Sequence, residues 1–265
     1  MKGNRFLRFY GPFLLVWFAG ASWAASSKRD RSDIRLVVVV AVDQLRADYL
    51  ERFQGGFSEG LARFVEKGVT FSHGYHAHAV TSTGPGHAAI STGSYPSRSG
   101  IIGNQWYEKD GTRQTYCVGD DRSPVLFSDG SQSKPSEGRS PRNLLVTALG
   151  DWMKDSNPRS RVVSASRKDR AAVLMGGKKP DGAFWYDPSS GDFVTSTFYE
   201  DELPGWLLKF NQRNIPEESF GELWNPLPFT IKALQAKQVL AKDFGWFASG
   251  FPHAIGSSSP VPNSA

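Results

Sequence analysis

The chain has a single cysteine, Cys117, among its 265 residues. A lone cysteine excludes a framework of internal disulfides, which is how many small exported domains are stabilised. The fold must therefore be stabilised by a hydrophobic core or by bound metal. A chain of this length can bury a sizeable core as one large domain or as two small ones.

The chain also lacks an apolar segment long enough to cross a bilayer. Its N-terminus has the three parts of a secretory signal instead: basic residues without an acid in 1–10, an apolar stretch over 12–21, and small residues at Ser22 and Ala24. The apolar stretch is shorter than the roughly 20 residues that a membrane helix needs. We expect 1–24 to be a cleaved signal peptide and the mature protein to be periplasmic or secreted, without a stable membrane anchor. The alternative is an uncleaved N-terminal anchor.

Beyond residues 1–10, no block of the sequence carries charge of one sign. The formal net charge is +5, but cleavage of the signal would remove basic residues, and the remaining Lys and Arg are spread among acids. Proteins that bind nucleic acid gather their basic residues on one face or in one run. The charge pattern therefore argues against a nucleic-acid partner.

Strand and helix patterns alternate along the chain. Residues 34–42 form a nearly continuous apolar run, which is typical of a strand buried on both faces of a parallel sheet. The other expected elements are helices over 57–67, over 86–92 and from Ser140-Pro141 onwards, with short strands at 161–165 and 184–186. This alternation predicts the α/β class, with a mostly parallel central sheet flanked by helices.

Composition also suggests where the domain begins and ends. Residues 25–33 are polar and charged, which is typical of a short linker, and the Ser- and Pro-rich stretch 256–265 is typical of a disordered tail. We therefore expect the domain to occupy 34–255. Within it, residues 104–135 are rich in Gly, Asp, Ser and Tyr and are interpreted as a loop or small hairpin insertion.

Asp43 directly follows the first apolar run. A carboxylate at this point is costly unless it binds a cation or caps the next helix. For this residue alone, a metal ligand and an ordinary N-cap are equally good interpretations. In α/β sheets, however, ligands gather beyond the carboxyl ends of strands, where Asp43 is expected to lie.

Thr83 begins the segment Thr83-Gly84-Pro85-Gly86-His87, ahead of a helical pattern. A hydroxyl at a helix N-terminus faces unpaired backbone N–H groups, which form a natural anion site. A nearby dication would lower the pKa of this hydroxyl and make it a competent nucleophile. The alternative is a threonine that caps a Gly/Pro turn. Asn104, after Gly103, could donate its amide to a phosphate oxygen, or could be an ordinary turn residue.

Lys168 and Arg170 follow the strand expected at 161–165. In an extended segment, residues two apart point the same way, so both cations could reach one dianion. The arginine fork and the lysine point charge together suit the terminal oxygens of a phosphate. The alternative is a solvated basic loop.

Three histidines, His73, His76 and His78, suggest a second metal hypothesis. His76 and His78 would share one face of a strand. No carboxylate or thiolate follows at ligand spacing, so we interpret them as a polar strand rim rather than a zinc site. His87 is better placed to orient the Thr83 loop than to bind metal.

Taken in order, these residues resemble the alkaline phosphatase superfamily. The resemblance is strongest to secreted, broad-specificity alkaline phosphatases with a threonine nucleophile, which are akin to type I phosphodiesterases and nucleotide pyrophosphatases. It covers roughly residues 36–211. The blocks that carry it are Val42-Asp43-Gln44, Thr83-Gly84-Pro85-Gly86-His87, Thr92-Gly93, Gly100-Ile101-Ile102-Gly103-Asn104, Ser140-Pro141 and Ser166-Arg167-Lys168-Asp169-Arg170.

The resemblance implies metal-dependent hydrolysis of small-molecule phosphate esters, with two zinc ions in the full site. Asp43 and Thr83 would belong to one zinc site, and Thr83 would form a phosphothreonine intermediate. Asn104, Lys168 and Arg170 would bind phosphate oxygens. A Lys/Arg pair is similar to that of the monoesterase branch, and the alternative is a phosphodiesterase or nucleotide pyrophosphatase.

One departure from the family pattern concerns the other zinc ligands. Family members supply several Asp and His from a C-terminal half beyond the matched region, whereas His253 is the single histidine after His87. We therefore expect an incomplete alkaline phosphatase-like domain, truncated at the C-terminus. A catalytically inactive fragment is the third hypothesis.

Overall fold

The computed structural model describes residues 34–224 and 253–255. Its contacts divide the chain into a short N-terminal unit, Met1–Val40, and a second unit, Ala41–Ala265. The sheet and the candidate site both lie in the second unit. The expected signal peptide, linker and C-terminal tail lie outside the described residues.

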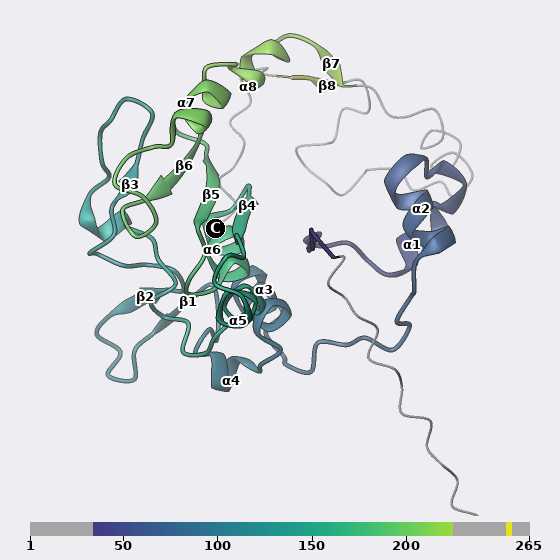
Figure 1. The fold of residues 1–265 in the computed structure, drawn as a ribbon, viewed down its shortest axis with the longest axis horizontal. Coiled ribbons are helices and arrows are strands. Elements are labelled where there is room, and N and C mark those ends of the chain that lie inside the picture. Colours follow the sequence, from purple (N-terminus) through teal and green to yellow (C-terminus); the bar gives the residue numbers. More distant parts are fainter. Residues whose placement is uncertain (1–33, 225–252, 256–265) are drawn as a thin grey trace, which may run out of the picture. The chain divides into compact units, whose positions relative to one another are not determined.

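The described part of the chain contains both helices and strands, which alternate from α5 to β5 (Figure 1). The helices are α1 (Asp48–Arg52), α2 (Glu59–Lys67), α3 (Thr83–Thr92), α4 (Pro96–Ser99), α5 (Leu149–Ser156), α6 (Asp169–Gly176), α7 (Gly205–Asn211) and α8 (Ile215–Glu218), with 3₁₀ turns η1 (Gln54–Gly56) and η2 (Pro135–Glu137). The strands are β1 (Gln105–Tyr107), β2 (Gln114–Tyr116), β3 (Val125–Leu126), β4 (Val163–Ser166), β5 (Gly182–Asp187), β6 (Asp192–Ser196), β7 (Leu223–Trp224) and β8 (His253–Ala254).

The central sheet has four strands in the order β3-β6-β5-β4. β4 and β5 are parallel, with Val163 opposite Gly182, and α6 makes the crossover between them. β5–β6 and β3–β6 are antiparallel. The α/β expectation is confirmed, but within the described residues this sheet is mixed rather than mostly parallel, because β6 returns from β5 through a tight turn.

Both faces of the sheet are covered, and side chains along β5 point alternately to one face and the other. Ala183 and Trp185 pack with the buried face of α6, including Val173. Phe184, between them, points to the opposite face and packs with Leu207 of α7. The strand is therefore apolar throughout its buried part, since it contributes to two cores.

α3 packs on α6, and α6 packs on β4 and β5 (Figure 1). The α3–α6 contact includes a hydrogen bond of 2.8 Å from the Ser91 hydroxyl to the carbonyl oxygen of Leu174. Gly93 ends α3 with a φ of 60°, a left-handed conformation that glycine adopts without a steric penalty. This packing fixes the N-terminal turns of α3 and α6, which carry most of the expected site residues.

The insertion expected at 104–135 contains a hairpin in its first part, and the rest is mostly loop. β1 and β2 pair antiparallel, with Gln105 opposite Tyr116. The segment does not stay separate from the central sheet, however, because β3 adds to the edge of β6.

The strand expected at 34–42 is wrong. These residues form no strand, and most of their side chains are exposed, including Val38 at 69%. A strand needs a neighbour to satisfy its backbone N–H and C=O groups, and no described strand pairs with this run. An apolar pattern shows that a segment favours burial, but it does not identify the partner.

The helix expected from Ser140-Pro141 is also wrong, because local hydrogen bonds hold Ser140 elsewhere. Its N–H donates to the Val118 carbonyl at 2.9 Å, and its hydroxyl donates to Asp120 Oδ2 at 2.7 Å. The helix begins at Leu149 instead, where the N–H of the preceding Ala148 donates to the Asp151 carboxylate at 2.7 Å. Asp151 therefore caps this helix, and the Ser140-Pro141 pattern predicted the wrong starting residue.

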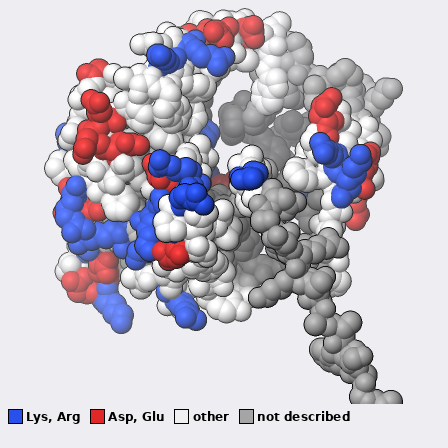
Figure 2. Space-filling model, viewed as in Figure 1, with Lys and Arg blue, Asp and Glu red and all other residues white. Residues whose placement is uncertain are grey.

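In the described part of the chain, no helix is long and apolar enough to cross a membrane. Figure 2 shows acidic and basic side chains interspersed on the face viewed.

Candidate functional site

Asp43, Thr83 and Lys168 come together although they are far apart in the sequence. The Thr83 hydroxyl donates a hydrogen bond of 3.1 Å to Asp43 Oδ2. The Lys168 ammonium lies 3.2 Å from the same carboxylate oxygen and 3.5 Å from the Thr83 hydroxyl. One cation, one anion and one hydroxyl thus share a small volume at the start of α3.

The Thr83 side chain is positioned by the first turn of α3. Ser82 is the N-cap residue, and Thr83 is the first residue in the helix. His87 Nδ1 lies 2.8 Å from the Thr83 carbonyl oxygen. Because a carbonyl oxygen only accepts, Nδ1 must carry the proton. This contact agrees with the expectation that His87 orients the Thr83 segment.

Asn104 is held against the same turn. The Gly84 N–H donates to Asn104 Oδ1 at 2.8 Å. A Cβ added at Gly84 would lie 3.1 Å from the Gly103 carbonyl oxygen and 3.2 Å from both Asn104 Oδ1 and Cys117 Sγ. The glycine therefore permits this close contact, which leaves the Asn104 Nδ2 group as the end of the amide that can donate to a ligand.

This arrangement corrects one expectation about the helix N-terminus. The Gly84 N–H is occupied by Asn104, Pro85 has no N–H, and the Gly86 N–H donates to the Ser82 carbonyl at 3.0 Å. The first turn of α3 therefore offers few free backbone donors to an anion. If an anion binds here, side chains rather than the helix N-terminus would have to supply most of its contacts.

We expected Lys168 and Arg170 to project from one extended segment, but they do not. β4 ends at Ser166, Lys168 is the N-cap of α6 with extended backbone, and Arg170 lies in the first helical turn. Lys168 contacts Asp43 and Thr83, whereas Arg170 Nη1 donates to the Tyr116 hydroxyl at 3.0 Å. Their directions differ because the chain enters a helix between them.

Several residues around Arg170 were not predicted from the sequence to belong to the site. The Tyr116 hydroxyl donates to Asp169 Oδ1 at 2.7 Å, and Arg139 Nε donates to Asp169 Oδ2. The Arg139 guanidinium also lies 4.8 Å from the centre of the Tyr116 ring. Asp169 stands between two candidate residues in the sequence, which is a signal that could have been used. Nothing in the sequence distinguishes Tyr116 from the other tyrosines.

Two pKa shifts describe the electrostatics here. Partial burial alone would raise the pKa of Asp43, but hydrogen bonds from Lys168 and Thr83 lower it below its usual value. Burial and the negative charge of Asp169 raise the pKa of Tyr116. Asp43 is therefore an anion and Tyr116 a neutral phenol under ordinary conditions.

The residues present fit part of a zinc site. Zinc in proteins usually has four ligands, and a carboxylate oxygen with a nearby hydroxyl, as in Asp43 and Thr83, supplies two. Among the described residues, no group of three or more His, Cys, Asp and Glu side chains is placed to hold a metal ion. His76 and His78 lie with ring centres 5.3 Å apart and have no third ligand in the described ranges.

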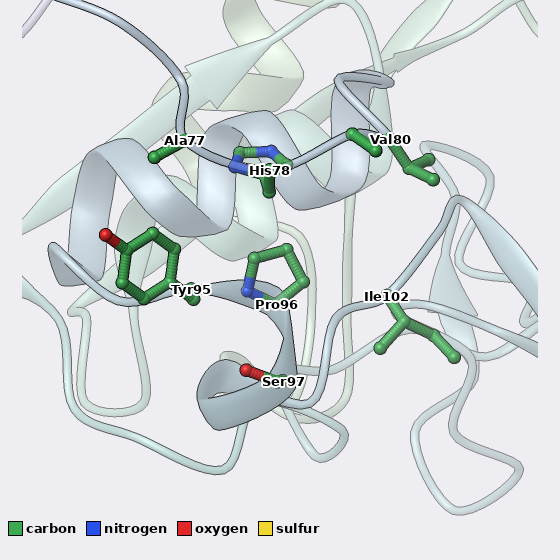
Figure 3. A pocket seen from close by; sticks show the side chains of 8 residues that line it. Ala77, His78, Val80, Tyr95, Pro96, Ser97 and Ile102 are labelled. Carbon is green, nitrogen blue, oxygen red and sulfur yellow. The ribbon is translucent and has the colours of Figure 1, made fainter.

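A shallow pocket of about 390 Å³ lies beside α3 (Figure 3). The segment before α3 contributes Ala77, His78 and Val80, which face Tyr95 and Pro96 at the start of α4. None of the expected site residues lines this pocket.

Comparison with known proteins shows the family to which the chain belongs. Residues 37–225 match the family model of type I phosphodiesterases and nucleotide pyrophosphatases. The chain is 37% identical over 225 residues to alkaline phosphatase PhoV of Synechococcus elongatus, covering 83% of this chain and 40% of that protein. It is 41% identical over 196 residues to alkaline phosphatase PafA of Elizabethkingia meningoseptica, covering 73% and 35% respectively.

The fold also matches a crystal structure of an alkaline phosphatase PafA variant, with a TM-score of 0.66 and 38% identity over 70% of this chain and 36% of that one. In that variant a threonine is replaced by serine, and an asparagine, a lysine and an arginine are replaced by alanine. The chain thus spans less than half the length of these relatives. Because the family model matches well over half of the chain, the chain belongs to the type I phosphodiesterase and nucleotide pyrophosphatase family.

Proposed function

We propose that this chain carries the nucleophile half of a metal-dependent phosphate-ester hydrolase of the alkaline phosphatase type. The observation that carries the proposal is the contact of the Thr83 hydroxyl with Asp43 Oδ2 at 3.1 Å, with Lys168 within 3.5 Å of the hydroxyl. A hydroxyl next to a carboxylate and a cation, at the start of a helix, is suited to attack on phosphorus.

In the proposed reaction, Thr83 Oγ1 forms a bond to the phosphorus of a monoester while the bond from phosphorus to the leaving oxygen breaks. The hydroxyl proton ends on the leaving alcohol or in solvent. Water then attacks the phosphothreonine, which releases inorganic phosphate and restores the hydroxyl. The atoms and charges of the reaction balance without an oxidant, a reductant or a second co-substrate besides water.

Asp43 and Thr83 would hold one zinc ion, and other divalent ions could take the same place. When bound, the metal would supply positive charge that lowers the pKa of the Thr83 hydroxyl. The remaining zinc ligands would come from outside the described residues, since these offer no cluster of three ligands. The second zinc of the family site would likewise depend on such ligands.

Asn104, Lys168 and Arg170 would bind the phosphate oxygens. The PafA variant supports this assignment through its pattern of replaced residues. Its threonine and asparagine are as far apart in sequence as Thr83 and Asn104, and its lysine and arginine are two positions apart, like Lys168 and Arg170. A monoester dianion has one more charged oxygen than a diester, so two cations favour the monoester.

A phosphodiesterase or nucleotide pyrophosphatase is the second candidate, because the matching family model is described in those terms. The substrates of the two candidates differ at one oxygen on phosphorus, which is charged in a monoester and carries a second ester group in a diester. A charged oxygen there would meet the cations, whereas a diester places a neutral ester group at the same point.

The test is a comparison of p-nitrophenyl phosphate with bis(p-nitrophenyl) phosphate, using the full chain with added zinc. We expect a higher kcat/KM for the monoester than for the diester, and stoichiometric zinc binding together with turnover would exclude the inactive-fragment hypothesis. Replacing both Lys168 and Arg170 by alanine should erase this preference, while Arg167→Ala, an exposed neighbour, should keep it. An unchanged ratio in the double variant would refute the role of the cations. Absence of both zinc binding and turnover would support the inactive-fragment hypothesis for this chain.

The N-terminal pattern supports export to the periplasm or the medium. Expression of the complete reading frame with its signal should yield a mature protein that begins at Ala25 in the exported fraction. N-terminal sequencing of a protein that still begins at Met1 would contradict this assignment.

A further inference from the structure

The hydroxyl of Tyr116 is a bridge between an anion and a cation. It donates to Asp169 Oδ1 at 2.7 Å and accepts from Arg170 Nη1 at 3.0 Å. A phenol has one proton and oxygen lone pairs. Since the proton is directed to Asp169, a lone pair of the same oxygen remains for the arginine.

Asp169 is already occupied at both oxygens. Oδ1 accepts from the Tyr116 hydroxyl and from the Arg170 backbone N–H, the latter at 2.6 Å, and Oδ2 accepts from Arg139 Nε. Among the residues that the structure describes, the Arg170 guanidinium forms no ion pair with a carboxylate, although Asp169 is its sequence neighbour. The arginine is thus held by a neutral group and keeps its charge available to an anion.

The bridge is built into the fold on both sides. Tyr116 ends β2 of the hairpin, and Arg139 packs over its ring at 4.8 Å. The side chains of Arg139 and Asp169 are 22% and 16% exposed, so this ion pair is largely shielded from solvent. Asp169 and Arg170 occupy the first turn of α6, which is fixed by its packing on α3 and the sheet. The hairpin therefore sets the direction of an arginine that belongs to another element.

We propose that Tyr116 and Asp169 are positioning residues that hold the Arg170 guanidinium for the phosphate and so determine the preference for monoesters. This inference rests on the proposed role of Arg170 in binding phosphate oxygens. A carboxylate in place of the phenol would hold the arginine equally well but would neutralise it. A phenol fixes the direction of the guanidinium and leaves its charge to the substrate.

The first arm of the test reads the position of Arg170 and needs no activity. In an NMR spectrum of the full chain with labelled arginine, Nη1 and Nη2 of Arg170 should give separate signals, because a held guanidinium rotates slowly. Tyr116→Phe should merge them. Tyr107→Phe, which removes an exposed hydroxyl from the same hairpin, should leave them separate. Merged Arg170 signals in the unchanged chain, or separate signals in a folded Tyr116→Phe variant, would overturn the proposal.

The second arm reads the effect on the reaction. Tyr116→Phe should lower kcat/KM for p-nitrophenyl phosphate about tenfold, with a smaller loss for the diester, as expected for a misplaced binding group. In a chain that already carries Arg170→Ala, the same change should have no further effect. An equal loss in both backgrounds would mean a general structural role and would also overturn the proposal. If the unchanged chain has no turnover, the proposed function fails, while the NMR arm still decides whether Tyr116 positions Arg170.

Discussion

The hydroxyl of Thr83 donates to Asp43 Oδ2 at 3.1 Å across 40 positions of sequence. The two residues belong to different elements, because Asp43 lies in a turn and Thr83 begins α3. Lys168 completes the contact from the start of α6. The site is therefore a product of tertiary structure, and substitutions within it should affect function and stability differently.

Asp43→Asn should impair function far more than stability. The Lys168–Asp43 ion pair is exposed, with side-chain exposures of 39% and 42%, and such pairs contribute about 1 kcal/mol or less. Loss of the proposed metal ligand and of its contact with the proposed nucleophile should lower kcat/KM by about 100-fold or more. Urea unfolding and zinc binding by equilibrium dialysis measure the two effects. Asp48→Asn, which breaks the exposed pair with Arg46, is the matched control and should change neither.

Gly84→Ala should disturb Asn104, whereas Gly86→Ala should not. An added Cβ at Gly84 would meet Asn104 Oδ1 at 3.2 Å and force it to shift, but the same atom at Gly86 meets nothing within 4 Å. We expect Gly84→Ala to lower turnover about tenfold. Gly86→Ala should raise the free energy of unfolding by up to about 1 kcal/mol, because alanine favours the helix. Equal effects of the two substitutions would contradict the proposed contact.

Asp151→Ala should be among the most destabilising single substitutions. The carboxylate is fully buried and accepts from the backbone N–H groups of Ala148, Lys178 and Lys179, at distances from 2.7 to 3.1 Å. Its loss leaves three donors without partners, at a cost of about 3–5 kcal/mol. Chemical denaturation measures the change. Asp155→Ala, on the same helix with an exposed partner, should cost less than about 1 kcal/mol.

Asp120 should make stability dependent on acid pH. Burial alone would raise the pKa of this carboxyl, but hydrogen bonds from Ser140, Arg122 and Ser123 lower it to about 2. The unfolded chain has the ordinary pKa of about 3.9. The stabilisation, about 2.5 kcal/mol, is therefore complete above pH of about 4 and is lost as pH falls toward about 2.

Asp120→Asn should lower the free energy of unfolding at neutral pH and flatten its dependence between those two pH values. The measurement is urea unfolding at a series of pH values. Asp121→Asn, whose side chain is 75% exposed, should leave the acid dependence unchanged. A curve for Asp120→Asn as steep as that of the unchanged chain would show that Asp120 does not carry the effect.

Local patterns predicted the central elements of the fold well. β4 and β5 lie where strand patterns indicated, α3 includes the expected helix 86–92 but begins earlier, at Thr83, and the hairpin falls within the expected insertion. These elements are specified by neighbouring residues, such as Gly93 at the end of α3. The resemblance also predicted that Asp43 and Thr83 would meet.

Features that depend on distant partners could not be predicted. The apolar run 34–42 indicated burial but no pairing, and the Ser140 hydroxyl bonds to Asp120 rather than capping a helix. Likewise, no sequence spacing connects Tyr116 with Asp169 and Arg170. Such contacts form between elements that the tertiary structure brings together, so the sequence pattern of any single element does not predict them.

The most direct test of Thr83 as the nucleophile is to trap its covalent intermediate. The zinc-loaded chain is mixed with p-nitrophenyl phosphate, quenched with acid and digested, and the phosphorylated peptide is located by mass spectrometry. The proposed mechanism predicts phosphate on Thr83, absent in Thr83→Ala and absent from the nearby Ser82 and Ser91. Turnover without phosphate on Thr83, or phosphate on another residue of this segment, would contradict it.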